Sequence, residues 1–478
     1  MSLGRQALNG AFWTYTEKFG AQVISFGVSI LMARMLHPSE FGLIGMLTVF
    51  IALGQTLIDS GLTQSLIREK EPTQKDYSTV FIFNLTGSII VYLLIYLAAP
   101  YISKFYEQEQ LINITRIYCL SFIINAFSTI QITKLTKELN FKTQLLVSLP
   151  SLIISSAFGL FFAIKGFGVW SLVYMYLIQS TLKSLQFWFH SKWRPSLVFD
   201  KESFLHHFEY GYKLGLSGMI SSIFSNIYPV IIGKFFSPAS LGFYDRANAI
   251  RNVPLSQLIS TLNKVTFPLF AKINEDDMRL KNVYKQIMQT VIFFIAPVML
   301  ILSVLSEPVI LFLLSDKWLP SAEYMQILCI AGILSPFHIY NLNILKVKGR
   351  SDLFLKLEII KRIIIILTLV ISIQFGVIGV IWGQIINSVI FLFINSYYSG
   401  KLINYSLFQQ IKDISLYIFM AVIMGAVVYG MNNYFFDKSI VFVKILIPGL
   451  TGMIFYFGLL WVFNVEAVKN IKNLMKSK

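Results

Sequence analysis

The sequence predicts an all-α integral membrane protein, and two observations carry that prediction. Hydrophobic residues make up 55% of the 478 residues and charged residues only 13%, with a mean hydropathy of +0.66. A soluble core cannot hide that much apolar surface. The apolar runs are about 20 residues or longer, enough to cross a bilayer as a helix, whereas strands of a membrane barrel are about ten residues long and alternate strictly.

Fourteen apolar segments are the candidate transmembrane helices. They are residues 11–36, 41–67, 77–100, 111–133, 143–164, 167–190, 209–233, 240–271, 282–314, 321–345, 353–375, 377–399, 411–434 and 439–463. The longest connection, at residues 191–208, is too short to fold as a soluble catalytic domain. Cys119 and Cys329 both lie within predicted spans, so we expect no disulfide framework.

Two short patterns recur about 200 residues apart, in the same order. Residues 31–44 and 231–244 share a cation, a proline and a glycine in register, and residues 167–173 resemble residues 375–381. The paired positions are Arg34 and Lys234, Pro38 and Pro238, and Gly42 and Gly242. The copies are six helices apart, and an even offset keeps orientation, so the pattern predicts parallel repeats with a site between them near the midplane.

This repetition predicts three parts of the chain. Residues 1–200 form an N-terminal six-helix lobe, residues 201–400 a second six-helix lobe, and residues 401–478 hold helices 13 and 14 with a basic cytoplasmic tail.

Lysine and arginine residues gather in alternate connections. With the N-terminus inside, the inner segments hold about 23 of them and the outer loops about 6, so both termini are expected in the cytoplasm. The formal net charge of +16 is then mainly a topology signal that also attracts an anionic inner leaflet. No nucleic-acid partner is needed to explain it.

Charged residues inside predicted spans cost roughly 2.5–3.5 kcal/mol each, so they usually face a cavity or a partner. Helix 353–375 is the clearest case, with Glu358, Lys361 and Arg362 ahead of a short apolar run. The alternative is structural: Glu358 and Arg362 form an i, i+4 pair and Lys361 extends to the interface.

The other in-span cations are Lys18, Lys183, Lys213, Arg246 and Lys264. Arg246 and Lys264 share a face of helix 240–271 with polar residues, as expected if that face is wet. Alternatively, Arg246 belongs to an exposed outer turn, and Lys18, Lys183 and Lys213 are interfacial. The excess of cations favours an anionic headgroup such as a pyrophosphate, which all seven cations of these two groups are candidates to bind.

Asp59 stands alone in helix 41–67, beside Gln55. Asp59 and Glu358 are the candidates to bind a coupling Na⁺ or proton, although a structural role is the alternative for Asp59. We interpret His338 as a hydrogen-bonded bundle histidine, and His206 with His207 lacks further ligands at metal spacing. No metal site and no cofactor beyond a coupling ion is expected, and no nucleotide-binding or metalloprotease motif is present.

Several of these stretches resemble the polysaccharide exporters of the multidrug/oligosaccharidyl-lipid/polysaccharide flippase superfamily, and most closely the lipopolysaccharide and colanic acid exporter branch. The similar stretches are residues 38–42, 231–247, 267–268, 316–318 and 348–352. The resemblance implies two six-helix lobes, a central cationic cavity and alternating access that carries an undecaprenyl-pyrophosphate-linked oligosaccharide outward. Membrane lipids and polysaccharide polymerase machinery are the implied partners.

One departure from that branch concerns the helix at 209–233. The branch commonly has an Asn-x-Asp pattern there, but Asn226 is followed by Ile227, Tyr228 and Pro229. An ion-coupling role of that acid in relatives therefore has no counterpart here, and Pro229 is predicted to kink the helix.

Two other functions remain alternatives to a flippase for surface polysaccharide biosynthesis. A cation-coupled multidrug antiporter of the same superfamily would favour an anionic cavity, against the in-span balance. A membrane glycan polymerase or ligase would normally have a sizeable outer loop, and the predicted outer loops are short. The sequence therefore favours a secondary transporter over an enzyme.

Overall fold

The computed structural model describes residues 3–59, 61–463 and 465–466, and their regular secondary structure is helical throughout. The predicted all-α fold class is confirmed. By contacts the chain divides into two compact units, Met1–Gly242 and Phe243–Lys478, each of which is described here by itself. The predicted lobe boundaries at residues 200 and 400 rest on sequence repetition and stay a prediction. Most of the predicted basic tail, residues 467–478, lies outside the described residues.

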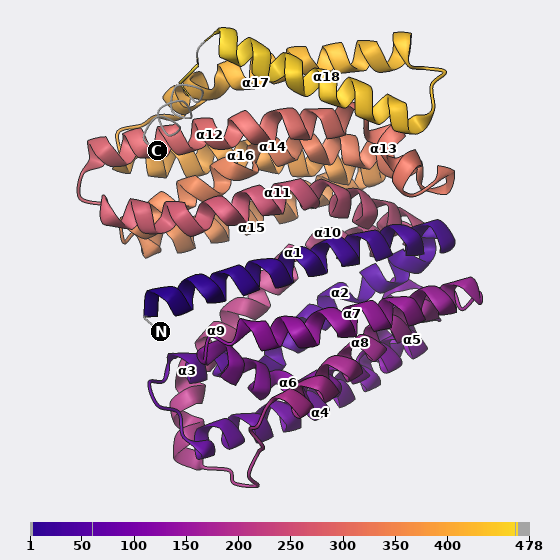
Figure 1. Ribbon diagram of the computed structural model, residues 1–478, viewed down its shortest axis with the longest axis vertical. Coiled ribbons are helices and arrows are strands. Elements are labelled where there is room, and N and C mark those ends of the chain that lie inside the picture. Colours follow the sequence, from indigo (N-terminus) through magenta and orange to yellow (C-terminus); the bar gives the residue numbers. More distant parts are fainter. Residues whose placement is uncertain (1–2, 60, 464, 467–478) are drawn as a thin grey trace. The chain divides into compact units, whose positions relative to one another are not determined.

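The first unit is built from ten helices and the start of an eleventh (Figure 1). They are α1 (Leu3–Met35), α2 (Pro38–Asp59), α3 (Leu62–Arg68), α4 (Gln74–Tyr106), α5 (Leu111–Tyr118), α6 (Leu120–Lys137), α7 (Phe141–Ile164), α8 (Val169–His190), α9 (Lys201–Ser225), α10 (Ile227–Phe235) and α11 (Pro238–Lys272). Helix α7 packs against α1 and α8, and α6 packs against α4 and α8. Helix α9 packs along α2 and α3, which places its side chains beside those of α2.

The second unit continues α11 and adds α12 to α18. They are α12 (Asp277–Val304), α13 (Ser306–Leu313), α14 (Pro320–Val347), α15 (Ser351–Ser372), α16 (Gly376–Leu402), α17 (Leu407–Gly430) and α18 (Val441–Val462). Helix α14 packs against α12 and α16, and α17 packs against α12 and α18. Helices α17 and α18 lie side by side at one edge of this unit (Figure 1).

All fourteen predicted segments fall on helix, but four of them are each divided into two helices. Gly61, with φ 71°, separates α2 from α3, because the left-handed conformation ends a regular helix there. In the described residues, nine helical segments are long and apolar enough to cross a membrane, and α9 with α10 forms one more, bent by 45°. The chain is therefore a multi-pass membrane protein, and the count of fourteen crossings remains a prediction.

The bend between α9 and α10 has a cause in the sequence. Proline has no N–H group, and its ring clashes with the carbonyl four residues earlier, so Pro229 cannot continue the helix across Ser225. Asn226 takes a non-helical conformation at the break and accepts from the N–H of Val230 at 3.1 Å. The predicted kink at Pro229 is confirmed.

The first repeated pattern forms a reciprocal contact within the first unit. A Cβ atom added at Gly42 would lie 1.7 Å from the carbonyl oxygen of Pro238. A Cβ atom added at Gly242 would lie 1.9 Å from the carbonyl oxygen of Pro38. The first turns of α2 and α11 thus cross backbone against backbone, and each glycine is required because only its lack of a side chain allows that approach. We call these four residues the proline–glycine crossing.

The second repeated pattern also has one local structure in both copies. Gly168 precedes α8 with φ 55° and Gly376 begins α16 with φ 73°, so each copy starts a helix from a glycine in a left-handed conformation. In the first copy, the carboxylate of Glu40 lies against Gly168, 2.3 Å from where a Cβ atom would be. That contact joins the first copies of the two patterns.

Candidate functional site

A polar cavity of about 430 Å³ lies between α2, α3 and α9 of the first unit, around Asp59. We call it the Asp59 cavity. Its lining residues are Ala52, Gln55, Thr56, Asp59, Gly61, Gln64, Leu214, Gly215, Gly218 and Ser222. Amides, hydroxyls and one carboxylate supply its polarity, and the lining includes no lysine or arginine. Such a set suits sugar hydroxyls or a small cation better than a phosphate.

Glycines and hydroxyls bring the walls of the Asp59 cavity together. Gly61 lies so close to α9 that an added Cβ atom would be 2.8 Å from the carbonyl oxygen of Gly211. The hydroxyls of Thr56 on α2 and Ser222 on α9 are 3.2 Å apart and share a hydrogen bond. Asp59 accepts from the Thr63 hydroxyl at 2.5 Å. Asp59 therefore has both a structural contact and a place in the cavity wall.

An aromatic pair supports the polar wall from α8 and α5. The Gln55 amide donates to the Tyr176 hydroxyl at 3.5 Å, and the Tyr176 ring stacks on the Tyr118 ring with centroids 4.6 Å apart. Stacked rings resist rotation, so the hydroxyl stays directed at Gln55. The amide is thereby fixed in one orientation at the cavity.

A second cavity, of about 430 Å³, follows along the same helices and is apolar. Its lining residues are Val49, Phe50, Ala98, Tyr101, Ile102, Phe105, Ile223, Ile227 and Val230. We call it the Phe50 cavity. The polar lining of α9 ends at Ser222 and the apolar lining begins at Ile223, next to the break at Asn226. One seam of the first unit thus offers a polar and then an apolar surface.

The in-span charges of α15 form a cluster in the second unit. Lys361 donates a short hydrogen bond to the Glu358 carboxylate, and an Arg362 guanidinium nitrogen lies 3.7 Å from the other carboxylate oxygen. Only 9% of Lys361 is exposed. The two cations thus share one carboxylate, and we call these three residues the α15 cluster.

His338 on α14 lies near the α15 cluster without a hydrogen-bond partner. Its ring centroid is 6.3 Å from that of Phe391, and the Lys361 ammonium is 5.9 Å from the same ring. Both ring nitrogens are shielded from solvent and make no hydrogen bond in the described part of the chain. Within the described residues, the ring therefore lacks the hydrogen bond that we expected of a bundle histidine.

The remaining predicted cations are dispersed rather than gathered. Lys18 and Lys213 are exposed, and Lys183 is half-buried with its ammonium 6.0 Å from the Phe187 ring. Arg246 is half-buried on α11 in the second unit, next to Asp245. Lys264 also belongs to α11, but its side chain lies outside the described residues. Within single units the structure brings together only Glu358, Lys361 and Arg362, and substrate binding by any of these residues stays a prediction.

His206 and His207 have partners that explain them without a metal. The His206 ring is 3.0 Å from the Glu69 carboxylate, and His207 shares a 2.8 Å hydrogen bond with Ser65. His207 also lies 3.6 Å from Asp76. Across the described residues, no group of three or more histidine, cysteine or acidic side chains is placed to hold a metal ion.

The sequence interpretation missed most of the Asp59 cavity. Gln64, Thr56 and Ser222 are ordinary polar residues when each is considered alone. Ser222 is more than 150 residues away from the other two along the chain. The available signal was the i, i+4 spacing of Gln55 and Asp59, which places both on one face of α2. Packing of α9 on that face was not readable from the sequence.

The fold and these sites define a helical transport-type membrane protein, and comparison identifies its family. A family model described as polysaccharide biosynthesis protein matches residues 31–323, more than half of the chain. The chain belongs to that family. Polysaccharide-related proteins are also among its relatives in sequence.

Two relatives align over most of both chains. The chain is 26% identical over 438 residues to the teichuronic acid biosynthesis protein TuaB of Bacillus subtilis, which covers 90% of each chain. It is 26% identical over 409 residues to the lipopolysaccharide biosynthesis protein WzxC of Escherichia coli, which covers 82% of each.

Solved structures confirm the fold. The lipid II flippase MurJ in an inward closed conformation matches with a TM-score of 0.77 at 16% identity, covering 95% of this chain and all of that one. An inward-facing transporter of the multidrug resistance MATE family matches with a TM-score of 0.61 at 16% identity, over 81% and 96% of the two chains. These likenesses show that the chain shares the fold of both transporters.

Proposed function

We propose that this protein moves a lipid-linked oligosaccharide across the bacterial inner membrane by alternating access, for the synthesis of a surface polysaccharide. The single observation that carries this proposal is the seam along α2 and α9, where the Asp59 cavity adjoins the Phe50 cavity. A hydroxyl-rich headgroup on a hydrocarbon chain needs both surfaces in that order. The family and the relatives TuaB and WzxC support the same class of substrate.

The proposed substrate is an undecaprenyl-pyrophosphate-linked glycan. Sugar hydroxyls would bond to Gln55, Thr56 and Asp59, and the hydrocarbon next to the headgroup would contact Phe50. As a separate proposal within the second unit, Lys361 and Arg362 can bind phosphate oxygens, because arginine offers a bidentate fork for them. The protein acts as a transporter and needs no catalytic group of its own.

Transfer between leaflets tests this function. Proteoliposomes carrying a fluorescent undecaprenyl-pyrophosphate oligosaccharide should show protein-dependent transfer, and Thr56→Val or Gln55→Leu should slow it about fivefold, the equivalent of one lost hydrogen bond. Thr290→Val is the matched control, because Thr290 and Thr56 each donate to the carbonyl four residues earlier at 2.8 Å. Transfer unaffected by the cavity variants would remove the Asp59 cavity from the path, and no transfer at all would reject the function.

A second set of variants tests the cations and the coupling ion. Arg362→Ala and Lys18→Ala should both lower transfer if the predicted cations contact substrate. A Na⁺ or proton gradient should accelerate transfer by the wild type. If Asp59 binds the ion, Asp59→Asn should abolish this acceleration, and if Glu358 binds it, Glu358→Gln should do so. Gradient-driven movement of a cationic dye, without movement of the lipid-linked sugar, would instead favour the multidrug antiporter.

A further inference from the structure

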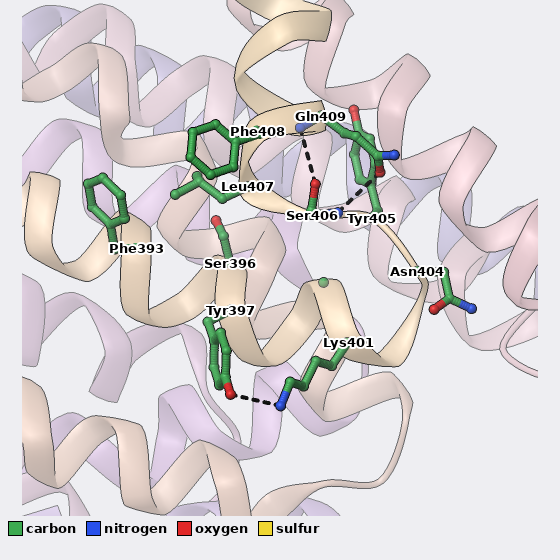
Figure 2. Close-up of a pocket in the computed structure, with 11 residues that line it drawn as sticks. Phe393, Ser396, Tyr397, Lys401, Asn404, Tyr405, Ser406, Leu407, Phe408 and Gln409 are labelled. Atoms are coloured by element: carbon green, nitrogen blue, oxygen red, sulfur yellow. Dashed lines mark hydrogen bonds between the residues drawn. The ribbon is translucent and has the colours of Figure 1, made fainter.

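A third cavity, of about 560 Å³, lies in the second unit where α16 ends and α17 begins. We call it the Lys401 cavity. Figure 2 shows Phe393 on α16 and Phe408 on the first turn of α17 on one side of the lining, and the Tyr397 hydroxyl and the Lys401 ammonium directed toward each other on the other side. It is separate in the chain from the seam and from the α15 cluster, and the proposed transport function does not use it.

Among the described residues that line this cavity, Lys401 is the only charged one. Its ammonium donates to the Tyr397 hydroxyl at 2.7 Å and lies 4.4 Å from the centre of the Tyr397 ring (Figure 2). These contacts hold the side chain along the wall. They use one of three N–H donors, so the others can bind an anion.

The charge around the cavity mouth is also positive. Lys281 donates to the carbonyl oxygen of Asn404, a lining residue, at 2.8 Å. Lys412 follows within two turns and is exposed. The nearest acid along α17, Asp413, lies 3.0 Å from the Lys285 ammonium and accepts from the Tyr405 hydroxyl at 2.5 Å. Lys285 also contacts Glu466 at 3.6 Å, so both acids already have a cationic partner.

The other walls are aromatic and face outward. Phe393 is 53% exposed, Tyr397 56% and Phe408 80%. Exposed aromatic rings at the ends of membrane helices lie at the level of lipid headgroups, where an apolar face and a polar neighbour are both satisfied. Apolar walls beside the Lys401 ammonium are complementary to a molecule that has one phosphate group and hydrocarbon chains.

We propose that the Lys401 cavity binds an anionic phospholipid of the bilayer, with its phosphate on Lys401 and its glycerol and first chain atoms against Phe393, Tyr397 and Phe408. The bound lipid bridges α16 and α17, because its phosphate contacts one helix and its chains contact both. It is a resident lipid, distinct from the transported one. Charge complementarity favours an anionic over a zwitterionic headgroup.

The probe is phosphatidylglycerol, offered to the full-length protein in phosphatidylcholine nanodiscs. Native mass spectrometry should find phosphatidylglycerol retained on the wild type, and thermal unfolding should shift upward with its mole fraction. Lys401→Gln should weaken retention about fivefold, the effect of one lysine near an anionic headgroup. Lys192→Gln is the matched control, because Lys192 is an exposed lysine of the first unit.

Two outcomes would overturn this proposal. Equal retention of phosphatidylglycerol by the wild type and Lys401→Gln would show that the cavity does not select the headgroup. Displacement of phosphatidylglycerol by undecaprenyl pyrophosphate, with the same dependence on Lys401, would assign the cavity to the transported lipid instead.

Tyr397→Phe keeps the ring and removes the hydroxyl, and it should weaken retention less than Lys401→Gln while folding normally.

Discussion

At the scale of single residues, charges in the apolar helices differ in what holds them. Lys361 is almost fully buried on a carboxylate of its own helix, whereas Lys18 and Lys213 are exposed. The sequence predicted the Glu358 and Arg362 pair from its i, i+4 spacing, and the structure has that pair. It did not predict that Lys361 takes the closer contact, because rotamer choice at i, i+3 depends on the neighbouring helices.

Removing the charge of Glu358 should destabilise the protein. Glu358→Gln leaves Lys361 and Arg362 without a shared anion, and we expect a loss of about 1–2 kcal/mol, below the cost in a soluble core because the unfolded chain in a membrane also finds partners. Unfolding in mixed micelles measures it, with Glu307→Gln on an exposed acid as the control. A variant as stable as the control would mean that the cluster is held by something other than the carboxylate.

Glu107 should give the stability a component that depends on pH. The hydrogen bond and charge of Lys234, 2.9 Å away, hold the pKa of the Glu107 carboxyl below its usual value. Because the folded pKa is the lower one, this contribution is complete above the ordinary pKa of about 4.3 and is lost as pH falls through the folded value. The stability difference between the wild type and Glu107→Gln should therefore shrink from pH 6 to about pH 3. A difference that is constant with pH would show that the pair does not contribute.

At the scale of helices, the sequence predicted which segments are helical but not where they divide. Apolar length marks a span, and Pro229 was a visible reason for a break. The break at Gly61 depends on a left-handed conformation that glycine permits without requiring. The walls of the Asp59 cavity follow from that break and from the packing of α9, so the site was only partly predictable.

The proline–glycine crossing should be intolerant of one methyl group. Alanine at Gly42 or Gly242 forces the first turns of α2 and α11 apart, and overpacking of this kind costs about 1–3 kcal/mol. Gly87→Ala is the control, because an added Cβ atom there meets nothing within 4 Å and alanine favours a helix. Unfolding of the three variants measures the difference. If Gly42→Ala and Gly87→Ala unfold alike, the two turns do not stay in contact.

The break at Asn226 should depend on Pro229. Pro229→Ala restores an N–H that can bond to Ser225, so α9 and α10 should straighten from their 45° bend. Spin labels at the exposed residues Leu216 and Phe235 would report a longer distance between them. Labels moved to Leu93 and Tyr101 on α4, also exposed, should show no change. An unchanged distance across the break would assign the bend to packing around Asn226.

At the scale of the whole molecule, composition and charge decided the class of protein, and the fold agrees. Apolar length required membrane helices, and the order of two short patterns indicated a repeated architecture. The repeated positions also proved to be in contact, since each glycine of the crossing meets the proline of the other copy. The repeated spacing of one proline and one glycine was a weak signal alone. Its structural role became clear only because the fold brings both copies into contact.

The orientation in the membrane remains to be tested, and four exposed lysines are suited to it. In a chain lacking Cys119 and Cys329, a cysteine at Lys104 or Lys438 should react with a membrane-impermeant thiol reagent on intact cells. A cysteine at Lys70 or Lys401 should react only after permeabilisation, since lysine-rich connections stay in the cytoplasm. Lys70 precedes α4 and Lys104 lies in its last turn, and Lys401 and Lys438 lie on either side of α17, so each pair tests one crossing. If both members of a pair react alike, that helix does not cross the membrane. The prediction of parallel repeats, which needs an even number of crossings between the two copies, is then wrong.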